Sequence, residues 1–276
     1  MTIRSIFALY NGQETEASAL NAAMDLAEAF GATLTIVHVV FTPPTGGFFG
    51  EAITVGTGYQ DLVLAESARA AAAARANADA VCSARGVTLG AAGGPVHYRE
   101  MREPSNAAVV RDLSLCDLIV VCAPKGSGWL VDATISDLTL FLTRRPLLVV
   151  RPGPTPNILG APAGVAWNGS LEAIHALIGG RPLLSHATPV TLYDGAGAAD
   201  ASRAADAYLR AADIFSTTTP ITGTGTEAAR QVLAAAKGSG LIVMGAYGHS
   251  VLRERLFGGF TETMLEEADV PLLLCH

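Results

Sequence analysis

The chain reads Ser239-Gly240-Leu241-Ile242-Val243-Met244 in its second half and Cys116-Asp117-Leu118-Ile119-Val120-Val121 in its first. Each segment is a short, uninterrupted apolar run. Runs of this kind, without a polar residue at every second position, are typical of strands buried on both faces, as in a parallel sheet covered by helices. These two segments therefore predict parallel strands in both halves.

The similarity of the halves extends in both directions from these strands. Downstream, Arg145-Pro146-Leu147-Leu148-Val149-Val150 matches Val270-Pro271-Leu272-Leu273-Leu274-Cys275. Upstream, an apolar strand ends in Asn11-Gly12 in one half and in Asn168-Gly169 in the other. A repeated order of elements indicates that the chain is two copies of one unit.

A proline-rich segment separates the copies. Residues 151–162 contain Pro152, Pro154, Pro156 and Pro162, which disfavour any regular element. We place the domain boundary there and predict a first domain over residues 1–152, a linker over 153–162 and a second domain over 163–276.

Helical patterns alternate with the strands. The first half has predicted strands at Thr33–Val40, Asp117–Val121 and Leu147–Val150. Predicted helices cover Thr15–Phe30, which Gly31 ends, Asp61–Arg85 and Ser105–Ser114, with Thr261–Ala268 in the second half. This alternation predicts an α/β protein built of two tandem doubly wound, Rossmann-like domains. The first copy also carries an insertion near Thr42–Tyr59, which we interpret as a lid, a dimer contact or a passive loop.

Composition excludes several classes of protein. The 276 residues are 50% hydrophobic and 16% charged, which is not the balance of a disordered chain. The net charge of −7 disfavours non-specific nucleic-acid binding. No apolar run reaches membrane-spanning length and no cleavable signal is visible, so we expect a cytoplasmic protein. Cys82, Cys116, Cys122 and Cys275 form no metal-binding pattern, and we expect them to act as small apolar residues.

A glycine-rich segment follows the strand that ends at Met244. Ligands bind beyond the carboxyl ends of strands in open α/β sheets, and glycines there let backbone amides approach a phosphate. The start of the predicted helix at Thr261 adds unpaired N–H groups. A phosphate cradle is one interpretation, and purely conformational glycines are the other. The residues concerned are Gly245, Gly248, Gly258, Gly259 and the Thr261 hydroxyl.

The same segment resembles the nucleotide loop of the universal stress protein family, which reads Gly-x-x-Gly, nine residues, then Gly-Ser/Thr. Here Gly245 and Gly248 are followed by nine residues and then Gly258. The resemblance implies five-stranded, mainly parallel sheets, adenine-nucleotide binding and pairing of the two halves as a pseudo-dimer through Leu147–Val150 and Leu272–Cys275. It implies a site comprising Asn168, Met244, Gly245, Gly248, His249, Gly258, Gly259, Phe260 and Thr261.

The chain departs from the family pattern at three places. Gly259 stands where a hydroxyl residue is usual, and Thr261 is a candidate replacement. Asn168 stands where ATP-binding relatives have Asp; it can still bond a ligand, although Asn-Gly is also an ordinary turn sequence. The first half has no such loop: Pro124 removes an amide donor and Asp132 would repel phosphate, so we interpret it as a degenerate domain that does not bind ATP in the same way.

Three functions are consistent with the sequence. The first is a stress-response or signalling module that binds ATP, with or without Mg²⁺, in its second half. The second is a structural or interaction protein of the same fold without nucleotide, and the third is a slow ATPase. No catalytic motif stands out, so we do not expect an enzyme beyond slow hydrolysis. Expected partners are an adenine nucleotide and a second copy in a homodimer; neither nucleic acid nor membrane is expected.

Overall fold

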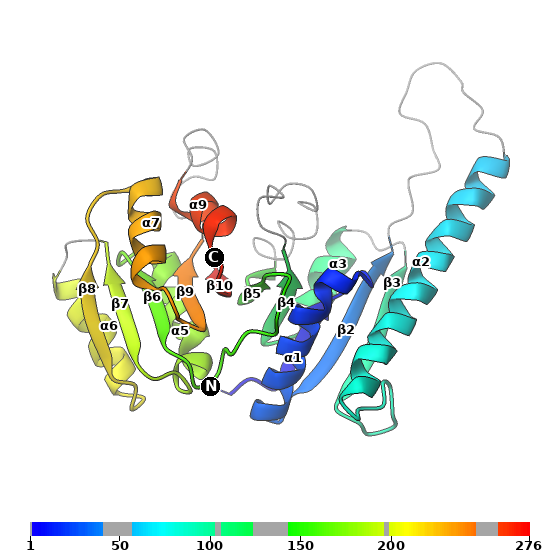
Figure 1. The fold of residues 1–276 in the computed structure, drawn as a ribbon, viewed down its shortest axis with the longest axis horizontal. Helices are drawn as coiled ribbons and strands as arrows, with labels where there is room; N and C mark the ends of the chain where they lie inside the picture. The colour runs from blue at the N-terminus through cyan, green and yellow to red at the C-terminus, as the bar shows by residue number, and fades with distance from the viewer. Residues whose placement is uncertain (1, 41–56, 103–105, 124–142, 196–198, 247–258) are drawn as a thin grey trace, which may run out of the picture.

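The computed structural model describes residues 2–40, 57–102, 106–123, 143–195, 199–246 and 259–276. Figure 1 shows two α/β halves side by side, joined at the middle of the molecule. Each half consists of parallel strands with helices packed on them, which is the fold class that the sequence predicts.

The first half runs from β1 to β5. In chain order, its elements are β1 (Ser5–Leu9), the 3-10 turn η1 (Glu14–Glu16), α1 (Ala17–Phe30), β2 (Thr33–Val40), α2 (Thr57–Ala84), β3 (Val96–Arg102), α3 (Asn106–Leu113), β4 (Leu118–Cys122) and β5 (Leu147–Val150).

The second half repeats this order. Its elements are β6 (Ala163–Trp167), α5 (Leu171–Leu184), β7 (Val190–Asp194), α6 (Ala199–Arg210), β8 (Ser216–Pro220), α7 (Gly225–Ala235), β9 (Leu241–Gly245), α9 (Phe260–Glu267) and β10 (Leu272–Cys275).

All the strands belong to one ten-stranded sheet in the order β3-β2-β1-β4-β5-β10-β9-β6-β7-β8. Within each half the neighbouring strands are parallel, whereas β5 and β10 are antiparallel, with Leu148 opposite Leu273. The two last strands therefore join the halves, as the family resemblance implies. The pairing also places the two halves in opposite directions along the sheet.

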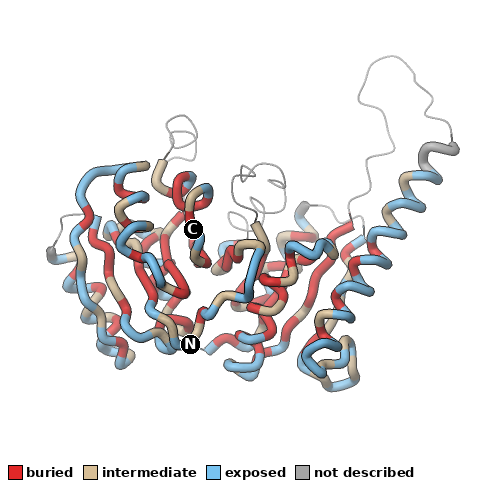
Figure 2. Tube along the Cα trace, in the orientation of Figure 1, coloured by how far each residue is buried: buried red, intermediate tan, exposed pale blue. Residues whose placement is uncertain are grey.

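Helices cover both faces of this sheet. One apolar core lies under α1, α2, α5 and α6, and a second lies under α3, α7 and α9. Figure 2 shows buried strands in the centre and helices exposed on their outer sides. Alternate residues of the central strands enter opposite cores; Leu148 belongs to the first and Val149 to the second. Burial on both faces explains the continuous apolar strand sequences.

The predicted elements agree with the observed ones to within a few residues. Helix α1 ends at Gly31, which has a left-handed backbone with φ 59°. Helix α2 begins at Thr57 rather than Asp61, so the end of the predicted insertion is helical. Its earlier part, residues 42–56, lies outside the described residues. Residues 151–162 contain neither helix nor strand.

The cysteines behave as small apolar residues. All four are free thiols; Cys82, Cys116 and Cys275 are buried, and Cys122 is partly exposed. Burial raises the pKa of Cys116 to about 12, which keeps this thiol protonated near neutral pH.

Candidate functional site

A cavity opens at the carboxyl ends of β6 and β9 in the second half. Its volume is about 250 Å³. Strand β6 pairs with β7 on one side and with β9 on the other, so the chain crosses over in opposite directions from this point. Such a reversal of strand order is where doubly wound folds place their ligands. The lining residues are Ala166, Trp167, Asn168, Ser170, Glu172, Ala173, Tyr193, Gly195, Ile221, Gly223, Thr224, Gly225, Ala228, Val232, Met244, Gly245, Phe260 and Thr261.

The turn after β6 forms one wall of this cavity. Gly169 has φ 72°, a backbone conformation that glycine adopts without strain. The Asn168 side-chain oxygen accepts a hydrogen bond from the Ser170 backbone N–H at 3.1 Å. Asn168 therefore shapes the turn, as an Asn-Gly sequence commonly does. Its side chain also borders the cavity, so the turn and the ligand interpretations are compatible.

Ser170 begins helix α5 beside this turn. Its hydroxyl oxygen accepts a hydrogen bond from the Ala173 backbone N–H at 3.2 Å. This bond satisfies one of the N–H groups that a helix start leaves without an intrahelical partner. The first turn of α5 is thereby fixed against the end of β6, and its Glu172 and Ala173 line the cavity.

Gly245 lies where β9 passes closest to α5. A Cβ atom added to Gly245 would lie 2.6 Å from the Ala173 nitrogen and 2.6 Å from the Glu172 carbonyl carbon. These are backbone atoms, which cannot rotate away as a side chain can. The contact between strand and helix is thus sufficient to explain a glycine at this position, in addition to any role with a ligand.

The start of α9 forms the opposite wall. Gly259 precedes the helix in an extended conformation, with φ −80° and ψ 178°. Phe260 is half-buried and Thr261 is buried, and both line the cavity, whose floor includes the fully buried Met244. Thr261 is 3% exposed, so its hydroxyl is enclosed by the protein.

The structure brings together six of the nine predicted site residues. Asn168, Met244, Gly245, Phe260 and Thr261 line the cavity, and Gly259 adjoins it in the chain. Gly248, His249 and Gly258 lie outside the described residues. Residues 247–258 connect β9 to α9, the elements that supply two walls of the cavity.

Sequence reasoning missed the walls that follow β7 and β8. Tyr193 and Gly195 lie at the end of β7, while Gly223–Gly225 leads from β8 into α7. The rule that ligands bind at carboxyl ends of strands could have identified Gly223, Thr224 and Gly225. The sequence feature connected with Tyr193 is a glycine in the neighbouring strand. A Cβ atom added to Gly164 of β6 would lie 2.5 Å from the Tyr193 ring, so the lack of a side chain at Gly164 leaves room for this ring.

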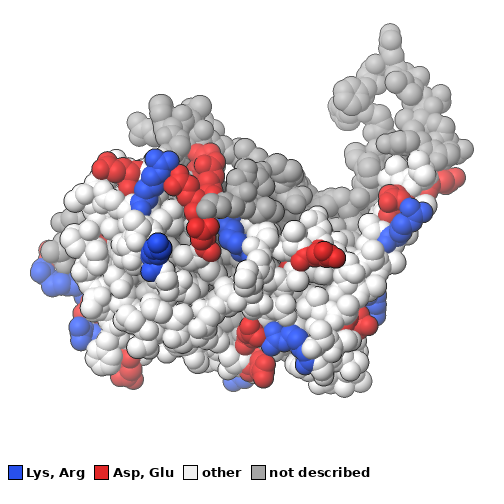
Figure 3. All heavy atoms as spheres, in the orientation of Figure 1, with Lys and Arg blue, Asp and Glu red and all other residues white. Residues whose placement is uncertain are grey.

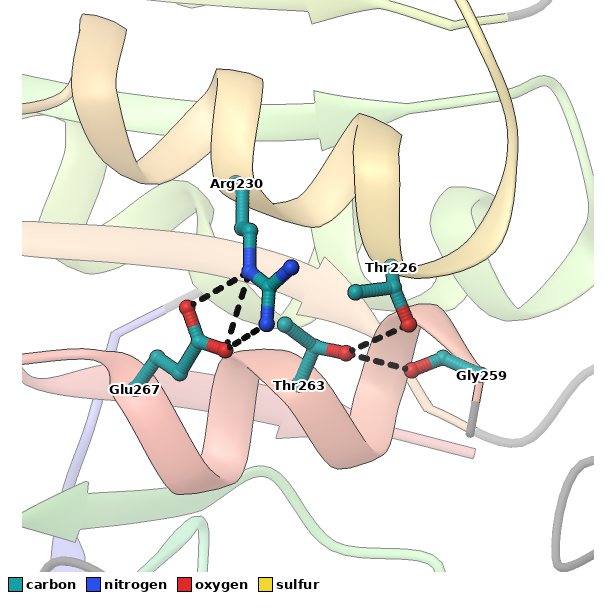
Figure 4. A network of polar contacts seen from close by, with 5 residues as sticks. All are labelled: Thr226, Arg230, Gly259, Thr263 and Glu267. Atoms are coloured by element: carbon teal, nitrogen blue, oxygen red, sulfur yellow. Dashed lines mark hydrogen bonds and ion pairs between the residues drawn. The ribbon is translucent and has the colours of Figure 1, made fainter. Parts of the chain in front are cut away.

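Polar contacts fix α9 against α7 near the cavity. Thr263 Oγ1 donates to the Gly259 carbonyl at 3.1 Å and lies 3.1 Å from Thr226 Oγ1 (Figure 4). At the other end of α9, Arg230 of α7 binds both carboxylate oxygens of Glu267, with Nη2 2.7 Å from Oε1. Paired contacts at both ends hold the start of α9 in register with the start of α7.

Different side chains stand at the corresponding place of the first half. The strand registers align Leu9 with Ala166. Leucine thus replaces the alanine that lines the cavity. In addition, the Glu16 carboxylate lies at the end of β1, where Oε2 accepts the Asn11 and Gln13 backbone N–H groups at 2.8 and 3.1 Å. A carboxylate of the chain itself occupies amide donors that follow β1.

Burial raises the pKa of Glu16, and the hydrogen bonds from residues 11–13 oppose this effect. A carboxyl whose pKa is raised in the folded state contributes stability that is fully present below its unfolded pKa and lost as the pH rises through the folded pKa. We therefore expect the free energy of unfolding of the wild type, relative to Glu16→Gln, to fall as the pH rises above about 4, the ordinary pKa of a glutamate in the unfolded chain. Urea unfolding at several pH values measures this difference; a difference that is constant or rises with pH would contradict the prediction.

A larger hollow lies at the junction of the halves. Its volume is about 440 Å³, and it is bordered by the start of β5, the end of β10 and one face of α5. Arg144, Arg145, Leu171, His175 and Ile178 contribute to its walls. Glu172 borders both hollows, but the larger one contains none of the predicted site residues, so we assign the candidate site to the smaller cavity.

The surface around the site carries both signs of charge. Figure 3 shows acidic and basic side chains interspersed on the face drawn, with acidic groups gathered near α7 and α9. Among the described residues, no group of three or more His, Cys, Asp or Glu could hold a metal ion. No helix within the described part of the chain is long and apolar enough to cross a membrane.

The fold and the cavity define a class: a tandem, doubly wound α/β protein with its open crevice in the second half. The model of the universal stress protein family matches residues 2–126 and 166–276. The chain therefore belongs to the universal stress protein family.

Two solved structures show the same fold. A universal stress protein from Archaeoglobus fulgidus DSM 4304 has a TM-score of 0.70 at 14% identity, over 99% of this chain and 96% of that one. A protein of unknown function from Pseudomonas aeruginosa PAO1 has a TM-score of 0.54 at 15% identity, over 99% and 92% of the two chains. A universal stress protein in complex with cAMP is 16% identical, has a TM-score of 0.30, and covers 55% of this chain and 100% of its own. No curated protein matches the chain significantly.

Proposed function

We propose that the second half binds an adenine nucleotide, ATP among them, and that occupancy serves a stress-response or signalling role. The observation that carries the proposal is the cavity at the strand reversal between β6 and β9, which the predicted site residues line from both sides. A crevice at this place, with helix starts directed to it, is suited to a ligand that is apolar at one end and anionic at the other.

The cavity walls differ in character, which suggests an orientation for the nucleotide. Tyr193, Ile221 and Val232 supply apolar surface for a base. Another wall is formed by Thr224, which precedes helix α7, and Gly225, which begins it. The phosphates would then extend toward the chain between β9 and α9, where the family resemblance assigns Gly248 and Gly258. Mg²⁺ would offset the repulsion between a triphosphate and the acidic side chains near α9.

The first half does not bind ATP in the same way under this proposal. Leu9 replaces Ala166, and Glu16 accepts the backbone N–H groups that follow β1. A second phosphate would meet an existing carboxylate there. One nucleotide per chain is therefore expected. We also propose that the protein is cytoplasmic and that two chains form a homodimer.

Two alternatives have less support. The first alternative is a protein that binds no nucleotide. The close packing of Gly245 against α5 is sufficient reason for a glycine there, and the Asn168 hydrogen bond explains this residue as part of a turn. Slow ATP hydrolysis would need a base, and Glu172 is the one carboxylate among the described residues that line the cavity. The walls otherwise offer groups suited to binding rather than proton transfer.

We expect Gly248→Val to lose adenine-nucleotide binding, since a branched side chain would block the approach of phosphate to a backbone amide. Thermal unfolding with and without Mg²⁺–ATP measures this. For the wild type, ligand at about 100 times Kd adds about 2.7 kcal/mol to the free energy of unfolding. The variant should show no shift, while retaining the melting temperature of the free wild type. Equal shifts in both proteins would contradict the assigned phosphate loop.

A further inference from the structure

Arg151 crosses from the first half of the molecule to the second. It follows β5, and its guanidinium donates to three backbone carbonyls. Nη1 bonds Ala123 at 2.9 Å in the first half, whereas Nε bonds Ala268 at 3.0 Å and Nη2 bonds Leu265, both in the second half. The Arg151 carbonyl in turn accepts the Ser18 hydroxyl of α1 at 2.7 Å. Arg151 therefore joins the end of β4, helix α1 and helix α9.

The two second-half carbonyls lie at the carboxyl end of α9. The last carbonyls of a helix have no intrahelical partner, and the helix dipole places partial negative charge there. A guanidinium is well suited to this position because it remains charged and has donors in a fixed fork. Burial lowers the pKa of Arg151, and the nearby Asp269 carboxylate opposes this effect.

The opposite end of the same helix borders the candidate site. Helix α9 has eight residues, which corresponds to about 12 Å. Phe260 and Thr261, at its start, line the cavity. A short helix moves as a rigid unit, so a contact that fixes its carboxyl end also fixes the amide groups at its start.

The repeat identifies the residue of the second half that is equivalent to Arg151. Arg151 follows β5 as His276 follows β10, and the paired registers make the two residues equivalent. His276 Nδ1 lies 3.1 Å from the Ala246 carbonyl, as Arg151 bonds the equivalent Ala123 carbonyl. The longer, forked arginine thus serves α9, the helix that borders the cavity.

The remaining contacts of α9 described above belong to the second half alone. Thr226 and Arg230 of α7 hold Thr263 and Glu267 (Figure 4). These contacts fix the position of α9 relative to α7. Arg151 adds side-chain hydrogen bonds from the first half to the carbonyls of Leu265 and Ala268 at the end of α9.

We propose that Arg151 is a positioning residue through which the first half of the chain sets the nucleotide affinity of the second. The proposal rests on the proposed function. It assigns to the degenerate half a role that needs no ligand of its own: it supplies the cation that holds α9, and hence one wall of the cavity, in place. Arg151 contacts the helix and is not among the residues that line the cavity.

The test compares Arg151→Met with a matched arginine variant. Methionine keeps part of the apolar stem and has no donor. Arg145→Met is the control, because Arg145 lies at the other end of β5 and its Nε bonds the Ser114 carbonyl within the first half, at 2.8 Å. Calorimetric titration with Mg²⁺–ATP gives Kd, and amide hydrogen exchange of residues 260–267 reports on α9 directly.

We expect Arg151→Met to weaken Mg²⁺–ATP binding about tenfold and to speed exchange in α9, whereas Arg145→Met leaves both close to wild type. Arg151→Lys should recover part of the affinity, and it serves as the test if the methionine variant does not fold. A Kd within about twofold of wild type in Arg151→Met, with wild-type binding intact, overturns this inference alone. A wild type that binds no adenine nucleotide overturns the proposed function and this inference with it.

Discussion

Replacement of Ala166 by leucine is expected to weaken adenine-nucleotide binding strongly without unfolding the protein. Ala166 lies near the end of β6, is half-buried and lines the cavity. Leucine would add three carbon atoms to a cavity of about 250 Å³. The ligand and these atoms would compete for the same space, so we expect affinity to fall by about tenfold or more.

The first half shows that the fold accepts leucine at this position. Leu9 occupies the equivalent place in β1 and packs against the second core. The melting temperature of free Ala166→Leu should therefore stay near that of the wild type. Ala166→Ser, which changes the volume little, is the control and should retain affinity. Calorimetric titration distinguishes the variants, and wild-type affinity in Ala166→Leu would show that the nucleotide does not occupy this cavity.

Among the variants proposed for this protein, Gly245→Ala is expected to lower the free energy of unfolding the most. The added methyl group would lie 2.6 Å from backbone atoms of Glu172 and Ala173, so β9 and α5 would have to separate. Overpacking of this kind typically costs about 3 kcal/mol at the upper end. Because β9 is central in the second half, paired with β6 and β10, the cost should appear in global unfolding.

Gly195→Ala is the matched control for this change. Its added Cβ would have one neighbour, the Trp167 carbonyl oxygen at 3.8 Å, which is an ordinary contact. Urea unfolding should give a free energy of unfolding close to wild type for Gly195→Ala and well below it for Gly245→Ala. If the two variants were equally stable, the close approach of β9 to α5 would be wrong.

The sequence alone predicted most of the fold. Continuous apolar runs such as Leu147–Val150 identify strands buried on both faces, because both sides of the sheet are covered by helices. Gly31 marks the end of α1 because the chain there has a left-handed backbone conformation, which glycine adopts readily. The start of α2 was less clear, since an alanine-rich helix can extend into a preceding loop without a capping residue to mark its beginning.

The candidate site was predictable in part, for a physical reason. Glycine spacing and a strand end locate Gly245 and the start of α9, because these signals are local in the chain. The contribution of Tyr193 depends on Gly164 in the neighbouring strand, and that of Arg151 depends on carbonyls more than 100 residues away. Contacts of this kind depend on strand order and on the direction of the second half, neither of which a local pattern specifies.

The central claim is that one adenine nucleotide occupies the second half of each chain. Mass spectrometry of nucleotide released by denaturing the purified protein, together with titration of the stripped protein with Mg²⁺–ATP, tests it most directly. The account predicts about one adenine nucleotide per chain at saturation, with an affinity lower by about tenfold or more in Ala166→Leu. No released nucleotide and no binding of ATP by the wild type would contradict it and would leave a protein that acts through its surfaces alone.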